Sequence, residues 1–147
     1  MRVFLDTNVL ASAVGSRGLC ADVLREVFAS HDLVTSEVAL DELRGVLRDK
    51  FGVAHRIIAE TQGLLRQDAI IARPGAIPSV RASDPADLAI LSSALSGKAE
   101  VFVTGDKELL DIGRIGDLEI LSPRQFWERL ISKAPRRGKR RRPSRLF

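Results

Sequence analysis

Two aspartates each follow a short apolar run. Asp6 comes directly after Val3–Leu5, and Asp106 follows the segment Glu100–Thr104 across one glycine. Neither run is long enough for a helix, so each predicts a strand buried on both faces, as at the centre of a parallel sheet. The carboxyl ends of such strands form the edge at which open α/β sheets bind ligands. A lone carboxylate is costly to bury there, so both positions predict a bound cation, a proton or several hydrogen-bond donors.

Two further acids are predicted to point inward from helices. Glu42 lies in a segment, 36–50, whose period is helical, and it falls on the apolar stripe that includes Val46. A glutamate on such a stripe is rarely tolerated unless it is paired or coordinates something. Asp87 lies in the first turn of the next predicted helix and shares the face of Ile90. Both carboxylates are therefore expected to lie over the same sheet as the two aspartates.

Three of the four acids could also have a purely structural role, as helix caps or turn residues. Asp6 is equally suited to cap the next helix, and Asp106 suits a turn or the cap of a short helix from Lys107. In Asp84-Pro-Ala-Asp87, Asp84 is the expected N-cap and Asp87 the third helical residue, an arrangement similar to a capping box. Capping and an inward-reaching carboxylate are compatible, so these readings do not exclude a shared site.

The four acids together predict a metal site. Four carboxylates at one edge would repel one another unless a divalent cation neutralised them. The remaining candidate ligands, Cys20, His31 and His55, are isolated and show no metal-ligand spacing. Oxygen ligands alone favour hard ions, Mg²⁺ or Mn²⁺. Such a cluster suits phosphodiester hydrolysis, in which the metal activates water and stabilises charge on the phosphate.

The rest of the pattern predicts strands that alternate with helices. Helices are expected at about 19–29, 36–50, 54–67, 84–97 and 107–110 and from Pro123 onward, and further strands at 32–35, 69–72 and 118–121. Leu10–Val14 is apolar and small and ends at a glycine-containing break. This order predicts an α/β fold, a three-layer α/β/α sandwich with a central, mainly parallel sheet. The last helix is expected to pack inward through Phe126, Trp127, Leu130 and Ile131.

The successive motifs resemble those of the PIN-domain family, and most closely its bacterial branch of VapC-like toxins from type II toxin–antitoxin pairs. The resemblance covers about residues 1–130 in the right order. It rests on four stretches: Leu5-Asp-Thr-Asn-Val-Leu10, the glutamate within Ser36-Glu-Val-Ala-Leu-Asp-Glu-Leu43, Asp84-Pro-Ala-Asp87 and Val103-Thr-Gly-Asp-Lys-Glu-Leu-Leu110.

This resemblance implies a Rossmann-like fold and a Mg²⁺- or Mn²⁺-dependent endoribonuclease. Position by position, the residues that match the family's catalytic and metal-binding quartet are Asp6, Glu42, Asp87 and Asp106. Thr104 matches the hydroxyl residue before the last acid, and Asn8 matches the polar position after the first. The family also suggests a homodimer and a small acidic or amphipathic antitoxin that blocks the site.

Composition bounds the class of protein. The chain has 147 residues, of which 45% are hydrophobic, and no run approaches the ~20 apolar residues of a membrane span. The absence of a signal-peptide pattern and the single cysteine predict a cytoplasmic protein that does not associate with membranes.

Charge divides the chain into two parts. Residues 133–147 hold eight Lys or Arg and no acid, whereas residues 1–132 hold 15 basic and 19 acidic residues. We therefore expect a PIN-like nuclease domain at 1–132 and a basic, disordered tail at 133–147. The tail is either a solvated, solubilising segment or a nucleic-acid contact. The candidate contact residues are Arg136, Arg137, Lys139, Arg140, Arg141 and Arg142.

Two other functions fit parts of the pattern. A phosphatase similar to the haloacid dehalogenases also places an aspartate after its first strand, but it would need a second aspartate where Asn8 stands. A PIN-like module that binds RNA or protein with idle acids would need no intact quartet. The four acids therefore favour the nuclease.

Overall fold

Side chains of the central strands alternate between two apolar layers. In β1 (Arg2–Leu5), Val3 and Leu5 pack on one side of the sheet and Phe4 on the other. Phe4 stacks on Phe102 of the neighbouring strand, with ring centroids 5.4 Å apart. All four side chains are fully buried, which explains why these strands read as continuous apolar runs.

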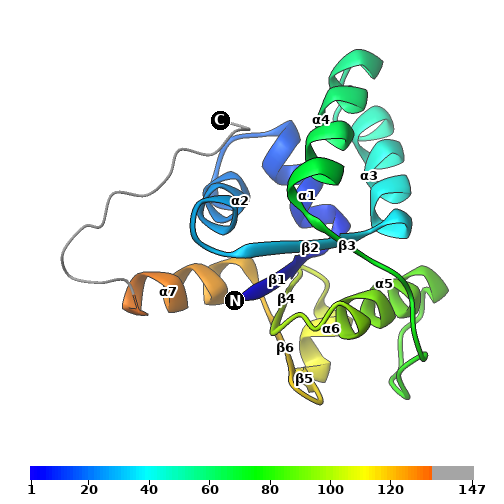
Figure 1. Ribbon diagram of the computed structural model, residues 1–147, viewed down its shortest axis with the longest axis vertical. Coiled ribbons are helices and arrows are strands. Elements are labelled where there is room, and N and C mark those ends of the chain that lie inside the picture. The colour runs from blue at the N-terminus through cyan, green and yellow to red at the C-terminus, as the bar shows by residue number, and fades with distance from the viewer. Residues whose placement is uncertain (134–147) are drawn as a thin grey trace.

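The computed structural model describes residues 1–133, which form a six-stranded sheet with helices on both faces (Figure 1). The strand order is β3-β2-β1-β4-β6-β5, and every pairing is parallel except that of β5 with β6. The other strands are β2 (Asp32–Ser36), β3 (Ile70–Ala72), β4 (Val101–Val103), β5 (Arg114–Ile115) and β6 (Leu118–Leu121).

Two groups of helices cover the sheet. One layer contains α1 (Thr7–Gly15), α2 (Leu19–Ser30), α3 (Glu37–Asp49), α4 (His55–Asp68) and α7 (Pro123–Lys133). The other contains α5 (Pro85–Ser96) and the short α6 (Lys107–Ile112), which lie at the lower right in Figure 1. The predicted three-layer α/β/α sandwich with a mainly parallel sheet is confirmed.

The strand order reverses at the centre of the sheet. The chain moves outward from β1 through β2 to β3, and then returns to place β4 on the other side of β1. Such a switch point leaves a crevice at the carboxyl ends of the two central strands. Asp6 follows β1 directly, and Asp106 follows β4 by three residues. The fold therefore brings Asp6 and Asp106, from the first and last motifs, to the same edge of the sheet.

Three features differ from the sequence-based expectation. Residues 7–15 form helix α1, which begins with no loop after β1 and for which no helix was predicted. The two-residue strand β5 was also not predicted. Ile131 is 57% exposed, so its predicted inward packing is wrong. It stands five residues after buried Phe126, about 140° around the helix, and so faces away from the core.

Within residues 1–133, no helix is both long and apolar enough to cross a membrane. The six basic residues from Arg136 to Arg142 that were predicted to contact nucleic acid lie outside the described residues.

Candidate metal centre

The four predicted acids line one pocket. Asp6 enters it from the end of β1, Asp106 from the start of α6, Glu42 from α3 and Asp87 from the first turn of α5. The pocket has a volume of about 360 Å³. Six carboxylates and no Lys or Arg are among its lining residues, which are Asp6, Thr7, Asn8, Glu42, Ser83, Asp84, Asp87, Asp106 and Glu108.

Asp6 is the most buried of these carboxylates and is held by two hydrogen bonds. It is 6% exposed. Its Oδ1 accepts from the backbone N–H of Thr7 at 2.8 Å, which makes Asp6 the N-cap of α1. Its Oδ2 accepts from the hydroxyl of Thr104 at 2.7 Å. Burial raises the pKa of Asp6, these two hydrogen bonds oppose the rise, and the charge of Asp106 adds to it.

Thr104 connects Asp6 to Asp106. While its hydroxyl donates to Asp6, the same oxygen accepts from the backbone N–H of Asp106 at 3.0 Å. Thr104 is fully buried and does not line the pocket itself. The hydroxyl therefore orients one carboxylate and the backbone of another.

The aspartates that cap helices α5 and α6 also line the pocket. Asp84 caps α5 by accepting from the N–H of Ala86 at 2.9 Å, and Asp106 caps α6 by accepting from the N–H of Glu108 at 2.9 Å. Both aspartates nevertheless line the pocket. Asp41, beside Glu42, is exposed and bonds to Arg44 on the surface, as the helical period predicts.

The carboxylates act on one another electrostatically. Partial burial raises the pKa of Asp87 to about 6, with further contributions from the negative charges of Asp6, Asp84, Asp106 and Glu42, in that order. Burial also raises the pKa of Glu42, the charges of Asp6 and Asp84 add to the rise, and the Thr7 hydroxyl opposes it. Four segments that are distant in sequence therefore share one electrostatic environment, which a cation would relieve.

The donor set fits a hard divalent ion. All charged groups that line the pocket are carboxylates, whose oxygens are the ligands that hard cations prefer, and the buried Thr7 hydroxyl adds a further oxygen beside Glu42. In residues 1–133, however, no three Asp, Glu, His or Cys side chains are already grouped closely enough to hold a metal. A cation would thus require side-chain movement within the pocket. Asp6, Asp87 and Asp106, with Glu42, are the residues that would hold it.

The structure adds residues that sequence reasoning did not assign to the site. Asp84 had been assigned only as a cap, and Thr7, Ser83 and Glu108 had no assigned role, although all four line the pocket. Asn8 also lines the pocket, whereas Lys107, the neighbour of Asp106, does not. The signal for Glu108 was its place within the motif that contains Asp106; Ser83 carried no signal beyond preceding the cap.

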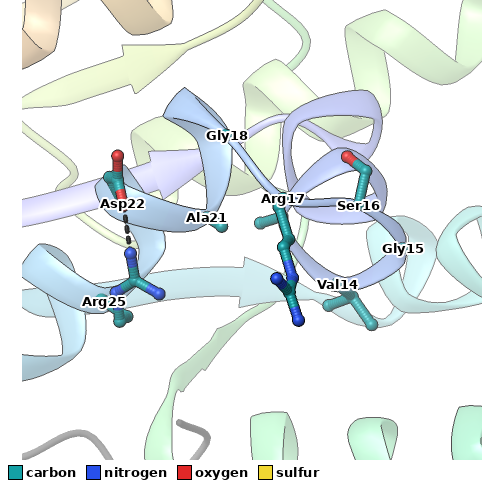
Figure 2. A pocket seen from close by; sticks show the side chains of 9 residues that line it. Val14, Gly15, Ser16, Arg17, Gly18, Ala21, Asp22 and Arg25 are labelled. Carbon is teal, nitrogen blue, oxygen red and sulfur yellow. Dashed lines mark hydrogen bonds and ion pairs between the residues drawn. The ribbon is translucent and has the colours of Figure 1, made fainter.

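A larger pocket lies elsewhere and has different chemistry. It measures about 690 Å³, lies where α1 leads into α2, and includes Arg17, Asp22 and Arg25. Figure 2 shows the ion pair between Asp22 and Arg25 at this place. None of the predicted site residues lines it. Chemistry rather than volume therefore identifies the acidic pocket as the candidate site.

Comparisons with known proteins agree with the fold. Residues 2–108 match the family described as PIN domain. No curated protein matches the sequence. VapBC2 from Rickettsia felis, bound to a DNA fragment from its promoter, superposes with a TM-score of 0.60 at 19% identity, over 83% of this chain and 98% of that one.

Two further solved structures are similar. VapBC-1 from nontypeable Haemophilus influenzae has a TM-score of 0.59 at 23% identity, covering 84% of this chain and 99% of its own. VapC20 from Mycobacterium tuberculosis, described as a Sarcin-Ricin loop cleaving toxin, has a TM-score of 0.55 at 18% identity, covering 80% and 98%. At these identities the likeness concerns the fold.

Proposed function

Because the chain belongs to the PIN-domain family and its four predicted acids line one pocket, we propose that it is a divalent-metal-dependent endoribonuclease. The observation that carries the proposal is the convergence of Asp6, Glu42, Asp87 and Asp106 from four segments on the switch point of the sheet. The proposed reaction is hydrolysis of RNA phosphodiester bonds.

The residues of the pocket have different proposed roles in binding the metal and the RNA. Asp6, fixed by Thr104 and by the N–H of Thr7, presents oriented oxygens to the metal. Asp87 and Asp106 complete the set from the opposite helical layer, and Glu42 adds a carboxylate from α3. When bound, Mg²⁺ or Mn²⁺ supplies an acidified water and neutralises charge on the phosphate. Asn8, an exposed amide that lines the pocket, would hydrogen-bond the RNA backbone.

The structural neighbours suggest the biological setting. Two of them are VapBC pairs and the third is a VapC toxin. We extend this setting to the chain, which would then be the toxin of a type II toxin–antitoxin system with a cognate antitoxin and a homodimeric form. Light scattering of the purified protein, alone and with the product of a neighbouring small reading frame, tests both assemblies.

The decisive experiment is cleavage of a mixed single-stranded RNA pool in Mg²⁺, Mn²⁺ or EDTA. We expect metal-dependent cutting, and a loss of at least about a hundredfold in Asp6→Asn. Glu42→Gln should also lose activity. Its matched control is Asp41→Asn, because Asp41 is the adjacent acid and points to solvent.

The outcomes separate the two candidate functions. If Asp6→Asn cleaves RNA at the wild-type rate, the acidic pocket is not the nuclease site. A wild type that binds RNA but neither cuts it nor binds Mn²⁺ would instead indicate the idle binding module.

A further inference from the structure

Two residues join the helices that carry Asp87 and Asp106. The backbone N–H of Ser83 donates to Glu108 Oε1 at 2.6 Å, and the Ser83 hydroxyl donates to Glu108 Oε2 at 2.6 Å. Both carboxylate oxygens of Glu108 are thus occupied by one residue, 25 positions earlier in the chain. We call this pair of hydrogen bonds the Ser83–Glu108 clasp.

The clasp lies directly between the two caps of the site. Ser83 precedes Asp84, the N-cap of α5, whose first turn presents Asp87. Glu108 is the second residue of α6, and its own N–H donates to the cap Asp106. A continuous chain of covalent and hydrogen bonds therefore runs from Asp106 through Glu108 and Ser83 to the start of α5.

This connection works against a repulsion. Asp84, Asp87 and Asp106 are like charges at the facing ends of α5 and α6, and their mutual effect is felt at Asp87. Among the described residues, the hydrogen bonds that join segment 73–87 to segment 104–112 are the two from Ser83 to Glu108. The clasp therefore opposes separation of the two helix starts.

We propose that Glu108 is a positioning residue that, by binding Ser83, sets the spacing of Asp87 and Asp106 for the metal. This inference rests on the proposed function, because it assumes that the two aspartates hold an ion. In this proposal Glu108 binds Ser83 rather than the ion: both of its oxygens accept from Ser83, and its side chain is exposed, whereas that of Asp6 is buried.

A double-mutant cycle tests the clasp. Glu108→Ala, Ser83→Ala and the double variant are compared with wild type for Mn²⁺ affinity by calorimetry and for the Mn²⁺ concentration that gives half-maximal RNA cleavage. We expect Glu108→Ala to weaken Mn²⁺ binding about tenfold, as for other outer-shell partners. Ser83→Ala, which keeps the backbone N–H, should cost less than Glu108→Ala. It should cost nothing further when Glu108→Ala is already present.

Two variants separate positioning from charge and from general stability. Glu108→Gln keeps the length and one acceptor oxygen, so it should recover part of the Mn²⁺ affinity lost in Glu108→Ala. Asp111→Ala removes an exposed carboxylate from the same helix and should leave Mn²⁺ affinity unchanged. Since Ser83 and Glu108 are exposed, the metal-free melting temperature should move by no more than about 2 °C in any variant.

Every other outcome contradicts either the proposed role of Glu108 or the proposed nuclease function. Equal losses in Glu108→Gln and Glu108→Ala, or a full Ser83→Ala effect in the Glu108→Ala background, would make Glu108 a direct ligand and overturn the clasp. Unchanged Mn²⁺ affinity in Glu108→Ala would also overturn it. If wild type binds Mn²⁺ but cuts no RNA, the proposed function fails while calorimetry still tests the clasp. If wild type does not bind Mn²⁺, both fail.

Discussion

At the scale of single residues, a buried hydroxyl is expected to do more for this site than its size suggests. Thr104 donates to Asp6 and accepts from the N–H of Asp106. Thr104→Val keeps the shape but leaves both groups without this partner. We expect a loss of about 1–3 kcal/mol in stability and a 10–100-fold weaker Mn²⁺ affinity. Urea unfolding and calorimetry measure the two effects.

Thr35, in strand β2, provides the opposite case. Its side chain is fully buried, and its Oγ1 has no hydrogen-bond partner in the described structure. Thr35→Val therefore removes an unsatisfied group and should be neutral or stabilise by about 1 kcal/mol. If both threonine-to-valine changes shift the urea midpoint alike, the hydrogen bonds of Thr104 are not the cause of its effect.

Asp87 makes the metal-free protein sensitive to pH. Its pKa of about 6 lies above the ordinary value of 3.8, so the native state binds the proton more tightly than the unfolded state. Its contribution to stability therefore falls as pH rises from about 4 to about 6. After a discount for its partial exposure, we expect Asp87→Asn to stabilise the metal-free protein at pH 7 by about 1 kcal/mol.

The measurement is the melting temperature in EDTA from pH 4 to pH 7. The variant should exceed wild type by about 3 °C at pH 7, and the difference should vanish near pH 4. Saturating Mn²⁺ should reverse the order at pH 7, because only wild type keeps this ligand for the native state. A variant that is less stable than wild type in EDTA at pH 7 would contradict the assigned repulsion.

At the scale of elements, α5 is held in place by a close approach to the sheet. A Cβ on Gly97, at the end of this helix, would lie 2.8 Å from Ala72 Cβ and from Val34 Cγ1. Gly97→Ala should therefore cost about 1–3 kcal/mol through overpacking. The control is Gly63→Ala in α4, where nothing lies within 4 Å and the change should stabilise by about 0.5–1 kcal/mol. If Gly97→Ala and Gly63→Ala have equal urea midpoints, then β2 and β3 shift enough to accommodate the added methyl group at little cost.

The elements also show what sequence could predict. Buried strands and amphipathic helices such as α3 were recognised because burial imposes a period or a run. Helix α1 has neither signal: buried Val9, Leu10, Ala11 and Ala13 surround it with apolar contacts, and Asp6 serves as strand end and N-cap at once. Its exposed side is narrow, with Asn8 and Ser12 one turn apart, and nine residues are too few for a helical period to be recognised.

The gathering of four acids in one pocket was predictable from the same kind of signal. Its four acids stood out because each breaks or ends an apolar pattern. The contact of Ser83 with Glu108 depends on the packing of two chain segments that no local pattern connects. Ile131 was assigned inward from its apolar type, although it lies about 140° around the helix from buried Phe126.

At the scale of the whole molecule, most of the chain carries the same negative charge as the proposed RNA substrate. Residues 1–132 carry an excess of four acidic groups, and the candidate site gathers six carboxylates. RNA would be repelled by this part of the chain before a metal is bound. The basic residues from 133 onward can compensate, because Lys and Arg bind phosphates and release counterions.

The basic residues should therefore govern how RNA affinity depends on salt. The background variant is Asp6→Asn, which is expected not to cleave RNA. In it, the six basic residues from Arg136 to Arg142 are changed to Gln at full chain length. If each contacts one phosphate, the slope of log affinity against log salt should become shallower by about 4, at about 0.7 per contact on a single strand. Fluorescence anisotropy from 50 to 300 mM salt measures it. An unchanged slope would mean that this segment does not contact RNA and that the metal-loaded pocket binds it alone.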